Sequence, residues 1–280
     1  MSQAQTPAGG GNRPAPSDVR ARSATRVPSA VRRILAPIML GAVLLFAWLV
    51  ATAPGAISPL LLPSPWSVAE RLASGLVAEG NLWPYIGVTA LESAAGCLVG
   101  LAIALPLAVL IYRSRWVSAA VIPFLGATQA IPAIALAPLL VLWIGYGLGA
   151  IVTLCVIMVF FPILVSTVVG LRHLDREVVE ASLMDGAGSL ARLRLIELPL
   201  AMPSVLAGVR NGFTLSVTGA VVGEMVMGGD GVGMLLTSQR DRFDTAGMIA
   251  SIVVLAVMAA LVYTFVATIE RRWSLTRPNQ

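Results

Sequence analysis

Few residues of this 280-residue chain carry the side chains that catalysis requires, and those few are scattered. His173 is the single histidine, and no cysteine or second histidine lies near it in the sequence. The two cysteines, Cys97 and Cys155, both fall inside apolar runs, which is the pattern of neither a disulfide framework nor a metal site. The sequence therefore offers no nucleophile–base pair and no metal cluster, and we interpret His173 as a loop residue.

All nineteen basic residues are arginine, and this absence of lysine limits what the chain can do with ATP. A phosphate-binding loop needs the pattern G-x4-G-K-[ST], in which the lysine reaches the terminal phosphates. If ATP drives this protein, hydrolysis must therefore take place on another subunit. The glycine-rich segment GGDGVG at 228–233 follows a predicted membrane helix rather than a strand, which argues against a nucleotide-binding loop.

The chain concentrates charge in one short stretch, EASLMDGAGSLARLRLIELP, which runs from Glu180 to Pro199. Just before it, Asp175 is a good N-cap for a short helix that continues to Met184. The DG pair at 185–186 predicts the end of that helix, because glycine readily takes the left-handed conformation.

A second short helix is predicted after this glycine turn. Ser189 is positioned to cap it, and the helix is expected to stop before Pro199, because the residue before a proline avoids the helical conformation. Two short helices joined by a glycine turn would form a compact knob, suited to a groove on a soluble partner. An ordinary amphipathic loop on the membrane surface explains the same composition equally well, so both interpretations stay open at this point.

The remaining sequence predicts membrane-spanning helices to position this stretch. Hydrophobic residues make up 57% of the chain, and the mean hydropathy is +0.86, which exceeds the usual composition of soluble domains. The apolar residues gather in runs near the roughly 20 residues that cross a hydrocarbon core. Six spans are predicted, at about 34–53, 90–112, 117–143, 149–170, 201–223 and 246–269.

Glycines mark two further features of these spans. The segment GYGLG at 145–149 predicts the turn between the third and fourth spans. Gly96 and Gly100 form a small-xxx-small pair, which allows a neighbouring backbone to approach closely in lipid.

The segments outside the spans differ in character. Residues 1–30 are rich in Pro, Gly, Ala, Ser and Arg, and they predict a disordered tail. The triplet ATA at 51–53 resembles a signal-peptidase site, but the apolar run before it is longer than a usual signal core, so an uncleaved first span is favoured. Within residues 59–80, Ser67 is positioned to cap a short amphipathic helix after Pro65, which either lies on the membrane surface or packs as a connecting helix.

The distribution of arginine predicts the orientation. Fifteen arginines lie in the two terminal segments and in the alternate loops that include the charged stretch, whereas the opposite side holds three, Arg71, Arg240 and Arg242. Loops rich in basic residues stay in the cytoplasm. Both termini and the charged stretch are therefore expected on the cytoplasmic side of the membrane.

Ionisable side chains inside a span are expected to have partners, because each costs about 2.5–3.5 kcal/mol at mid-membrane on insertion scales. Arg210 lies in the fifth span beside Asn211, where it either lines a path for an anion or forms an ion pair, and the ion pair is favoured. Glu224 lies near the outer end of the same span, where an outer gate, a contact with a binding protein and simple solvation are all open. The candidate partners of Arg210 are Glu180, Asp185 and Glu92.

The charged stretch resembles the EAA loop of bacterial ABC importer permeases. Glu180-Ala181-Ser182, Gly186 and Ile196-x-Leu198-Pro199 have the spacing of that motif, although its third residue is usually alanine rather than serine. Relatives often have a basic residue near the start of the second span, where this chain has Glu92. The ion pair or lipid contact that a basic residue would form there is therefore not expected in this chain. Further segments resemble the nitrate/sulfonate/taurine branch, which also includes permeases for thiamine precursors and riboflavin: LPSPWSV at 62–68, IPAIALAPLLVLWIGYGLG at 131–149, FFPILVSTVVGLRHLD at 160–175, PSVLAGVRNGF at 203–213 and VVGEMV at 221–226.

This resemblance implies a fold and two sets of functional residues. The fold is an all-α polytopic membrane protein with six transmembrane helices, the type I ABC importer (MetI-like) permease fold. The charged stretch would be the coupling helix that docks on the ATPase subunit, through Glu180, Ala181, Ser182, Asp185, Gly186, Ala187, Ile196, Leu198 and Pro199. The third and fifth spans would face the axis of a dimer, which makes the candidate path residues Thr128, Gln129, Arg210, Asn211, Thr214, Ser216, Thr218 and Glu224. Serine and threonine side chains commonly bond their own helix carbonyls instead.

The resemblance also implies partners and a location. The partners are two copies of an ABC ATPase subunit that hold ATP and Mg, a second permease copy in a homodimer, an extracytoplasmic solute-binding protein and membrane lipid. The chain itself would have no cofactor, no enzyme activity and no nucleic-acid partner. Its location would be the bacterial cytoplasmic (inner) membrane.

The expected organisation is a disordered cytoplasmic tail at 1–30, a first transmembrane helix at 31–58, an extracytoplasmic segment with an amphipathic helix at 59–89, a permease core at 90–270 with the coupling loop at 172–199, and a cytoplasmic tail at 271–280. The implied substrate is a small anion such as a sulfonate, taurine or nitrate, with a thiamine-precursor or riboflavin-like heterocycle as the alternative. A self-contained secondary transporter is less favoured, because Arg210 and Glu92 alone qualify as mid-membrane charges and no inverted repeat is evident.

Overall fold

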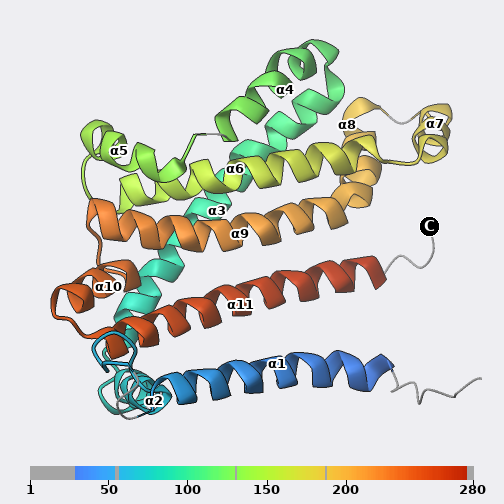
Figure 1. The fold of residues 1–280 in the computed structure, drawn as a ribbon. Coiled ribbons are helices and arrows are strands. Elements are labelled where there is room, and N and C mark those ends of the chain that lie inside the picture. Colours follow the sequence, from blue (N-terminus) through green and yellow to red (C-terminus); the bar gives the residue numbers. More distant parts are fainter. Residues whose placement is uncertain (1–28, 54–56, 130, 187, 276–280) are drawn as a thin grey trace, which may run out of the picture. The chain divides into compact units, whose positions relative to one another are not determined.

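The computed structural model describes residues 29–53, 57–129, 131–186 and 188–275, and every regular element in these ranges is a helix (Figure 1). The chain forms two compact units, residues 1–48 and 49–280. The first unit holds most of helix α1 (Ser29–Ala51), whose described apolar part, Leu35–Ala51, is shorter than a full membrane crossing. All other helices belong to the second unit.

Within the described residues, four helices are long and apolar enough to cross a membrane. They are α3 (Leu82–Arg113), α6 (Leu148–Arg172), α9 (Leu198–Met227) and α11 (Thr245–Leu275). In Figure 1, α6, α9 and α11 lie side by side, and α3 crosses α6 and α9 at an angle.

The helices of this bundle approach closely where one of them carries glycine. A Cβ atom added to Gly96 would collide with the side chain of Cys155, and one added to Gly100 would collide with Val159. The prediction from the small-xxx-small pair is therefore confirmed, and the neighbouring helix is α6. Outside these contacts much apolar surface stays exposed, since 17% of the apolar window of α11 is buried, which is typical of helices that contact lipid or further subunits.

The third predicted span, 117–143, is broken in the structure. It forms α4 (Arg115–Gln129), a 3-10 turn (Ala133–Leu136) and α5 (Ala137–Ile144). Pro132 has an extended conformation with ψ of 113°, and α5 has a proline in its first turn, so one continuous helix cannot form. The span predicted at 117–143 is therefore interrupted, and its two apolar helices are each shorter than a full crossing.

The turn predicted at 145–149 is confirmed. α5 ends at Ile144 and α6 begins at Leu148. Gly145 and Gly147 have φ angles of 94° and 97°, which lie in the left-handed region that glycine adopts without a steric penalty. This turn brings α5 back against α6 and α9.

The helix predicted near Pro65 is α2 (Pro65–Ala73), and it is followed by a single π-helical turn (Ser74–Ala78). Its cap is Ser64, whose side chain accepts a hydrogen bond from the Ser67 backbone N–H at 3.2 Å, so the prediction that Ser67 caps the helix is wrong. α2 packs against α11 and forms an ion pair between Arg71 and Asp244 at 3.1 Å. These contacts favour the connecting-helix interpretation.

Candidate functional site

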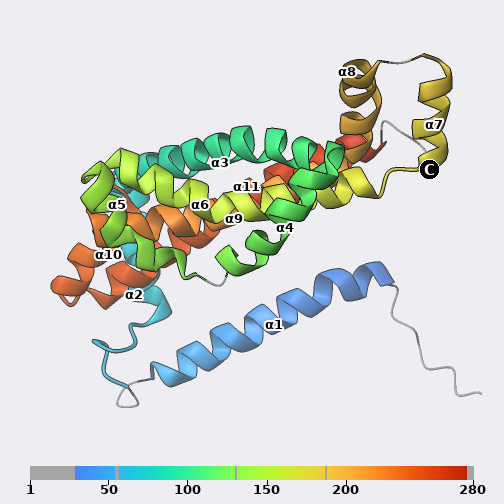
Figure 2. The same cartoon turned by 90° about the horizontal axis from the view of Figure 1, so that it is seen from above.

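The candidate site consists of two short helices that project from one end of the second unit (Figure 2). The first, α7 (Arg176–Met184), starts at its predicted cap, where the Asp175 carboxylate accepts a hydrogen bond from the Glu177 backbone N–H at 2.9 Å. The helix ends at Met184, and Gly186 has a φ of 74°. Both local predictions for this helix are therefore confirmed.

The second short helix differs from its prediction. α8 (Ser189–Arg192) follows an extended Gly188 at its N-cap, so Ser189 is the first helical residue and the prediction of a serine cap is wrong. The helix also runs past Pro199, through a π-helical turn (Leu193–Glu197) and directly into α9. In this wider turn the Leu198 N–H bonds to the carbonyl of Leu193. Pro199, which has no N–H to donate, then falls in the first turn of α9, where proline is tolerated.

The side chains on both sides of the glycine turn are exposed and apolar. Leu183, Met184 and Leu190 have exposed fractions of 53%, 90% and 76%. We call these three residues the α7–α8 patch. Exposed apolar groups of this kind mark contact sites for another protein, and the flexible Met184 side chain adapts well to such a partner.

The predicted coupling residues fall into two groups. Those near the turn are exposed, except for Ser182, whose buried hydroxyl donates to the Val179 carbonyl at 2.6 Å. Those at the far end of the stretch are half-buried where the π-helical turn joins α9. The exposed group is Glu180, Ala181, Asp185 and Gly186, the half-buried group is Ile196, Leu198 and Pro199, and Ala187 lies outside the described residues.

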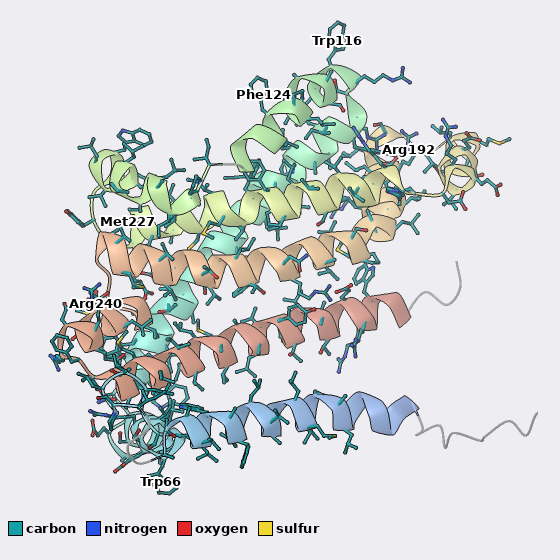
Figure 3. The ribbon with its side chains drawn as sticks, viewed as in Figure 1. Trp66, Trp116, Phe124, Arg192, Met227 and Arg240 are labelled. Carbon is teal, nitrogen blue, oxygen red and sulfur yellow. The ribbon has the colours of Figure 1, made fainter. Side chains whose placement is uncertain are left out.

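The base of α8 is held by a buried carboxylate that the sequence did not identify as functional. Glu197 is fully buried, and its two oxygens form ion pairs with Arg113 at 2.8 Å and with Arg192 at 3.0 Å. The same Arg113 guanidinium donates to the Ser189 carbonyl at 3.0 Å, and the Tyr112 hydroxyl lies 3.5 Å from Glu197. Figure 3 places Arg192 at this end of the bundle. We call Glu197, Arg113 and Arg192 the buried root.

The buried root ties three elements together. Arg113 ends α3, Arg192 ends α8, and Glu197 ends the π-helical turn before α9. A buried carboxylate without partners costs several kcal/mol, so this cluster fixes α8 against α3. The local signal for it was an acid in an otherwise apolar segment, LIEL, five residues after an arginine, but the contact with Arg113 is not visible from local sequence.

The ion pair predicted for Arg210 exists with a different partner. Arg210 pairs with Glu270 on α11 at 2.8 Å, and its guanidinium lies 4.9 Å from the centre of the Tyr263 ring. The predicted partners Glu180, Asp185 and Glu92 are therefore wrong. The physical reason is that α9 and α11 lie side by side, whereas the first two of those acids are exposed on or beside α7.

The other candidate path residues of α9 separate into two sets. Asn211, Thr214 and Thr218 are exposed and recur at helical spacing, so they share one face of the helix. The two threonine hydroxyls donate to the carbonyls of Arg210 and Thr214, at 3.2 Å and 3.4 Å. Ser216 is buried and instead donates to the Ser93 carbonyl on α3 at 2.7 Å. The side chains of Thr128 and Gln129 lie outside the described residues, and a path role for this whole set stays a prediction.

Glu224 is buried at the opposite end of the bundle, so its interpretation as a solvated interface residue is wrong. One oxygen accepts from the Thr89 hydroxyl at 2.7 Å, and the other accepts from the Gly233 N–H. The Val232 N–H donates to the same Thr89 hydroxyl at 2.9 Å. The end of the glycine-rich segment at 228–233 is also the start of α10 (Val232–Asp241), and there it binds a carboxylate of its own chain.

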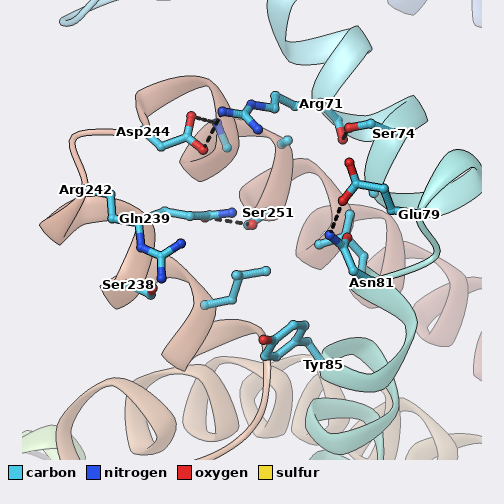
Figure 4. Close-up of a pocket in the computed structure, with 15 residues that line it drawn as sticks. Arg71, Ser74, Glu79, Asn81, Tyr85, Ser238, Gln239, Arg242, Asp244 and Ser251 are labelled. Carbon is cyan, nitrogen blue, oxygen red and sulfur yellow. Dashed lines mark hydrogen bonds and ion pairs between the residues drawn. The ribbon is translucent and has the colours of Figure 1, made fainter.

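A polar cavity of about 290 Å³ opens at this α10 end, between α3, α10, α11 and the segment around α2 (Figure 4). Its lining side chains bond to one another in several pairs. Arg71 pairs with Asp244, the Ser251 hydroxyl donates to Gln239 at 2.9 Å, and the Asn81 amide donates to Glu79 at 2.7 Å.

Comparisons with known proteins agree with this arrangement. The sequence model of the family described as binding-protein-dependent transport system inner membrane component matches residues 96–275. The chain is 38% identical over 240 residues to the riboflavin transport system permease protein RibX of Chloroflexus aurantiacus, which covers 85% of this chain and 89% of that protein. It is 26% identical over 235 residues to the taurine transport system permease protein TauC of Escherichia coli, which covers 82% of this chain and 86% of that protein.

A solved structure has a similar fold. A chain of the MetNI methionine ABC transporter in an inward-facing conformation superposes with a TM-score of 0.60 at 21% identity, and the match covers 70% of this chain and 98% of that chain. This likeness confirms the all-α permease fold expected from the sequence.

Proposed function

Because this chain belongs to the family of binding-protein-dependent transport system inner membrane components, we propose that it lines the passage of an ATP-driven importer and that an ATPase subunit docks on its α7–α8 patch. Its relatives are transport permeases, so its contribution is transport rather than catalysis. The observation that supports the docking is the exposed apolar patch around Gly186, whose α8 side the buried root fixes to the bundle.

The division of labour between subunits follows from composition. The chain has no lysine and therefore no phosphate-binding loop of the G-x4-G-K-[ST] type. ATP and Mg would bind the ATPase subunit, and the conformational energy would reach this chain through the docked patch. Two copies of each subunit and a solute-binding protein would complete the importer.

A movement of the α7–α8 patch would be transmitted to the bundle through the buried root. α8 is bonded at its base to the end of α3 and is continuous with α9 through the π-helical turn. A displacement of the patch would therefore shift the ends of two long helices together. The ATPase shifts the balance between the inward-open and outward-open states only as far as its contacts differ between them.

The proposed location is the bacterial inner membrane, with both termini and the α7–α8 patch in the cytoplasm. The support is the excess of arginine on that side, fifteen against three. The α10 end and its polar cavity would then face the binding protein.

For the substrate we favour a polar heterocycle of the riboflavin or thiamine-precursor type over a sulfonate, taurine or nitrate anion. The charge of Arg210 is already met by Glu270, and the exposed α9 face carries the neutral groups of Asn211, Thr214 and Thr218. The riboflavin permease is also more similar to this chain than the taurine permease. The anion remains the second candidate, because taurine is the solute in the name of that relative.

Reconstitution tests the proposed function. Proteoliposomes would hold this chain with its partner ATPase and binding protein, and uptake of radiolabelled riboflavin and taurine would be followed. Uptake is expected when all components and internal ATP are present, and none with this chain alone. Uptake by the lone chain along an ion gradient would contradict the proposal and favour a secondary transporter.

A further inference from the structure

The turn between α10 and α11 holds a phenylalanine in an unusual backbone conformation. Phe243 has a φ of 56°, and within the described part of the chain it is the one residue other than glycine with a positive φ. Its N–H donates to the Arg240 carbonyl at 3.0 Å, and the Asp244 N–H donates to the Gln239 carbonyl at 2.9 Å. These two bonds form a Schellman motif, which ends a helix and usually has glycine at the position of Phe243.

A bulky residue is unfavourable at this position. In the left-handed region the Cβ atom of an L-amino acid comes too close to the following carbonyl oxygen, and glycine avoids this contact. The Phe243 side chain gains little packing in return, because its exposed fraction is 74%. Folding stability alone therefore favours glycine over phenylalanine here, and residues held against such a local preference cluster at functional sites.

Charged residues flank Phe243 on both sides. Arg240 forms an ion pair with Asp241 at 2.9 Å, and Asp244 forms one with Arg71 at 3.1 Å. If the phenyl ring entered the hydrocarbon core, it would draw these charges toward it, and each of them is costly there. The turn therefore presents an apolar side chain to the aqueous side of the membrane surface.

Arg242, directly before Phe243, forms no ion pair within the residues that the structure describes. It lines the polar cavity of about 290 Å³ (Figure 4) and also a hollow of about 330 Å³, which Glu224 and Asp241 line as well. Both of these acids already accept hydrogen bonds from other groups. An exposed aromatic ring beside an arginine without an ion pair is the composition enriched at protein–protein interfaces.

We propose that Phe243 and Arg242 form a docking point for the extracytoplasmic solute-binding protein. An apolar pocket of that protein receives the phenyl ring, and a carboxylate beside the pocket pairs with Arg242. The hydrogen-bonded turn holds the ring in place before binding, so that docking loses little conformational entropy. This inference rests on the proposed function, because it names the surface at which the binding protein delivers its solute.

Binding measurements test the role of the phenyl ring. The purified solute-binding protein would be titrated onto the importer, which is this chain with its partner ATPase, in lipid nanodiscs. Phe243→Ala should weaken binding by roughly 10- to 100-fold, as expected for an aromatic anchor. Phe265→Ala is the matched control and should bind like the native importer, because Phe265 is also exposed, at 67%, but lies in the second half of α11.

The outcomes of this titration separate the inference from the proposed function. Equal affinities for the native importer and Phe243→Ala would overturn the inference and leave the proposed function intact. A native importer that does not bind the solute-binding protein at all would refute the proposed function, and the inference with it.

Arg242→Gln tests the charge in the same assay. The variant should associate more slowly with the binding protein, and its affinity should depend less on salt than that of the native importer. An unchanged association rate and salt dependence would overturn the role of Arg242.

Thermal unfolding separates docking from a structural role of Phe243. Phe243→Gly relieves the unfavourable conformation, so its melting temperature should rise by roughly 2–4 °C while binding is lost as in Phe243→Ala. A lower melting temperature for Phe243→Gly would show that the ring stabilises the fold, and it would overturn the inference.

A dye that senses polarity, attached to the thiol of Phe243→Cys in nanodiscs, identifies what covers this position. Cys97 and Cys155 are buried, so labelling elsewhere should be low. The dye should report water before the binding protein is added and an apolar surrounding afterwards. An apolar surrounding in the absence of the binding protein would indicate lipid or a second copy of the chain, and it would contradict the docking point.

Discussion

At the scale of single residues, the buried root explains how a charged loop is attached to an apolar bundle. Glu197 has no exposed surface, and each of its oxygens meets a different arginine. Charges that are removed from water stabilise a structure only when their partners are complete. Removal of one of the three charged side chains should therefore lower the folding stability by more than their ion pairs contribute to it.

Glu197→Ala tests this statement, because it leaves Arg113 and Arg192 close together without a counter-charge. We expect a loss of about 3–5 kcal/mol of folding stability, seen as a lower melting temperature of the purified protein. Glu177→Ala is the matched control, since that acid is exposed on α7 and should change stability by less than about 0.5 kcal/mol. Equal melting temperatures for the two variants would refute the role of the buried root.

Arg210 and Glu270 provide a second prediction at this scale. Either single change, Arg210→Gln or Glu270→Gln, leaves a half-buried charge unpaired between α9 and α11. The double variant removes both charges, so its stability loss should be smaller than the sum of the single losses by about 0.5–3 kcal/mol. Thermal unfolding of the three variants measures this coupling, and strictly additive losses would show that the pair is not an interacting unit.

These two residues also show what sequence reasoning reaches at the residue scale. The prediction that Arg210 forms an ion pair followed from the free-energy cost of an unpaired charge in a membrane, and the ion pair is confirmed. The identity of the acid depends on how α9 and α11 align, which no local signal contains.

At the scale of elements, the glycine turn between α7 and α8 gives the most specific prediction. Gly186 has a φ of 74°, whereas Gly188 is extended with a φ of −61° and has open space around it. Gly186→Val should distort the turn, since a β-branched residue in the left-handed region costs about 1–3 kcal/mol.

We therefore expect Gly186→Val to enter the membrane normally but to lose most ATP-driven uptake in proteoliposomes. Gly188→Ala should transport at the native rate, because alanine accepts the extended conformation. Normal uptake by Gly186→Val would contradict the docking of a partner at this turn.

The contact between α3 and α6 gives another prediction for elements. Gly100→Ala introduces a Cβ that collides with Val159, so the melting temperature should fall. Gly87→Ala, on the same helix, meets nothing within 4 Å and should raise stability slightly, because alanine favours a helix over glycine by about 1 kcal/mol. If both variants lowered the melting temperature equally, the close approach of the two helices would be disproved.

Elements with strong local signals were predictable from the sequence. Asp175 and Gly186 define α7 by themselves, and Gly145 with Gly147 defines the turn before α6. The helix through Pro199 was not predictable, because a π-helical turn removes the conflict that proline normally creates. Pro132 lies in a uniformly apolar run together with Pro123 and Pro138, so the sequence alone did not show which of these prolines interrupts the helix.

At the scale of the whole molecule, the account rests on a division of labour. In the proposed importer this chain would supply long helices and a small exposed patch, and a second protein would supply the free energy of ATP hydrolysis. The fold class was predictable because hydropathy and the spacing of the EAA-like motif can both be recognised in the sequence alone. The roles of the path residues stay predictions, because a passage between two copies would be lined by surfaces that are exposed in a single chain.

Cross-linking at the α7–α8 patch is the most direct test of this division. A photoreactive group would be attached to the thiol of Met184→Cys in the assembled transporter, with the exposed Met234→Cys on α10 as the matched control at the opposite end. Cys97 and Cys155 are buried, so background labelling should be low. We predict a cross-link to the ATPase subunit from position 184 and none from position 234. An ATP-hydrolysing, transport-competent complex that gives no cross-link from position 184 would contradict the account.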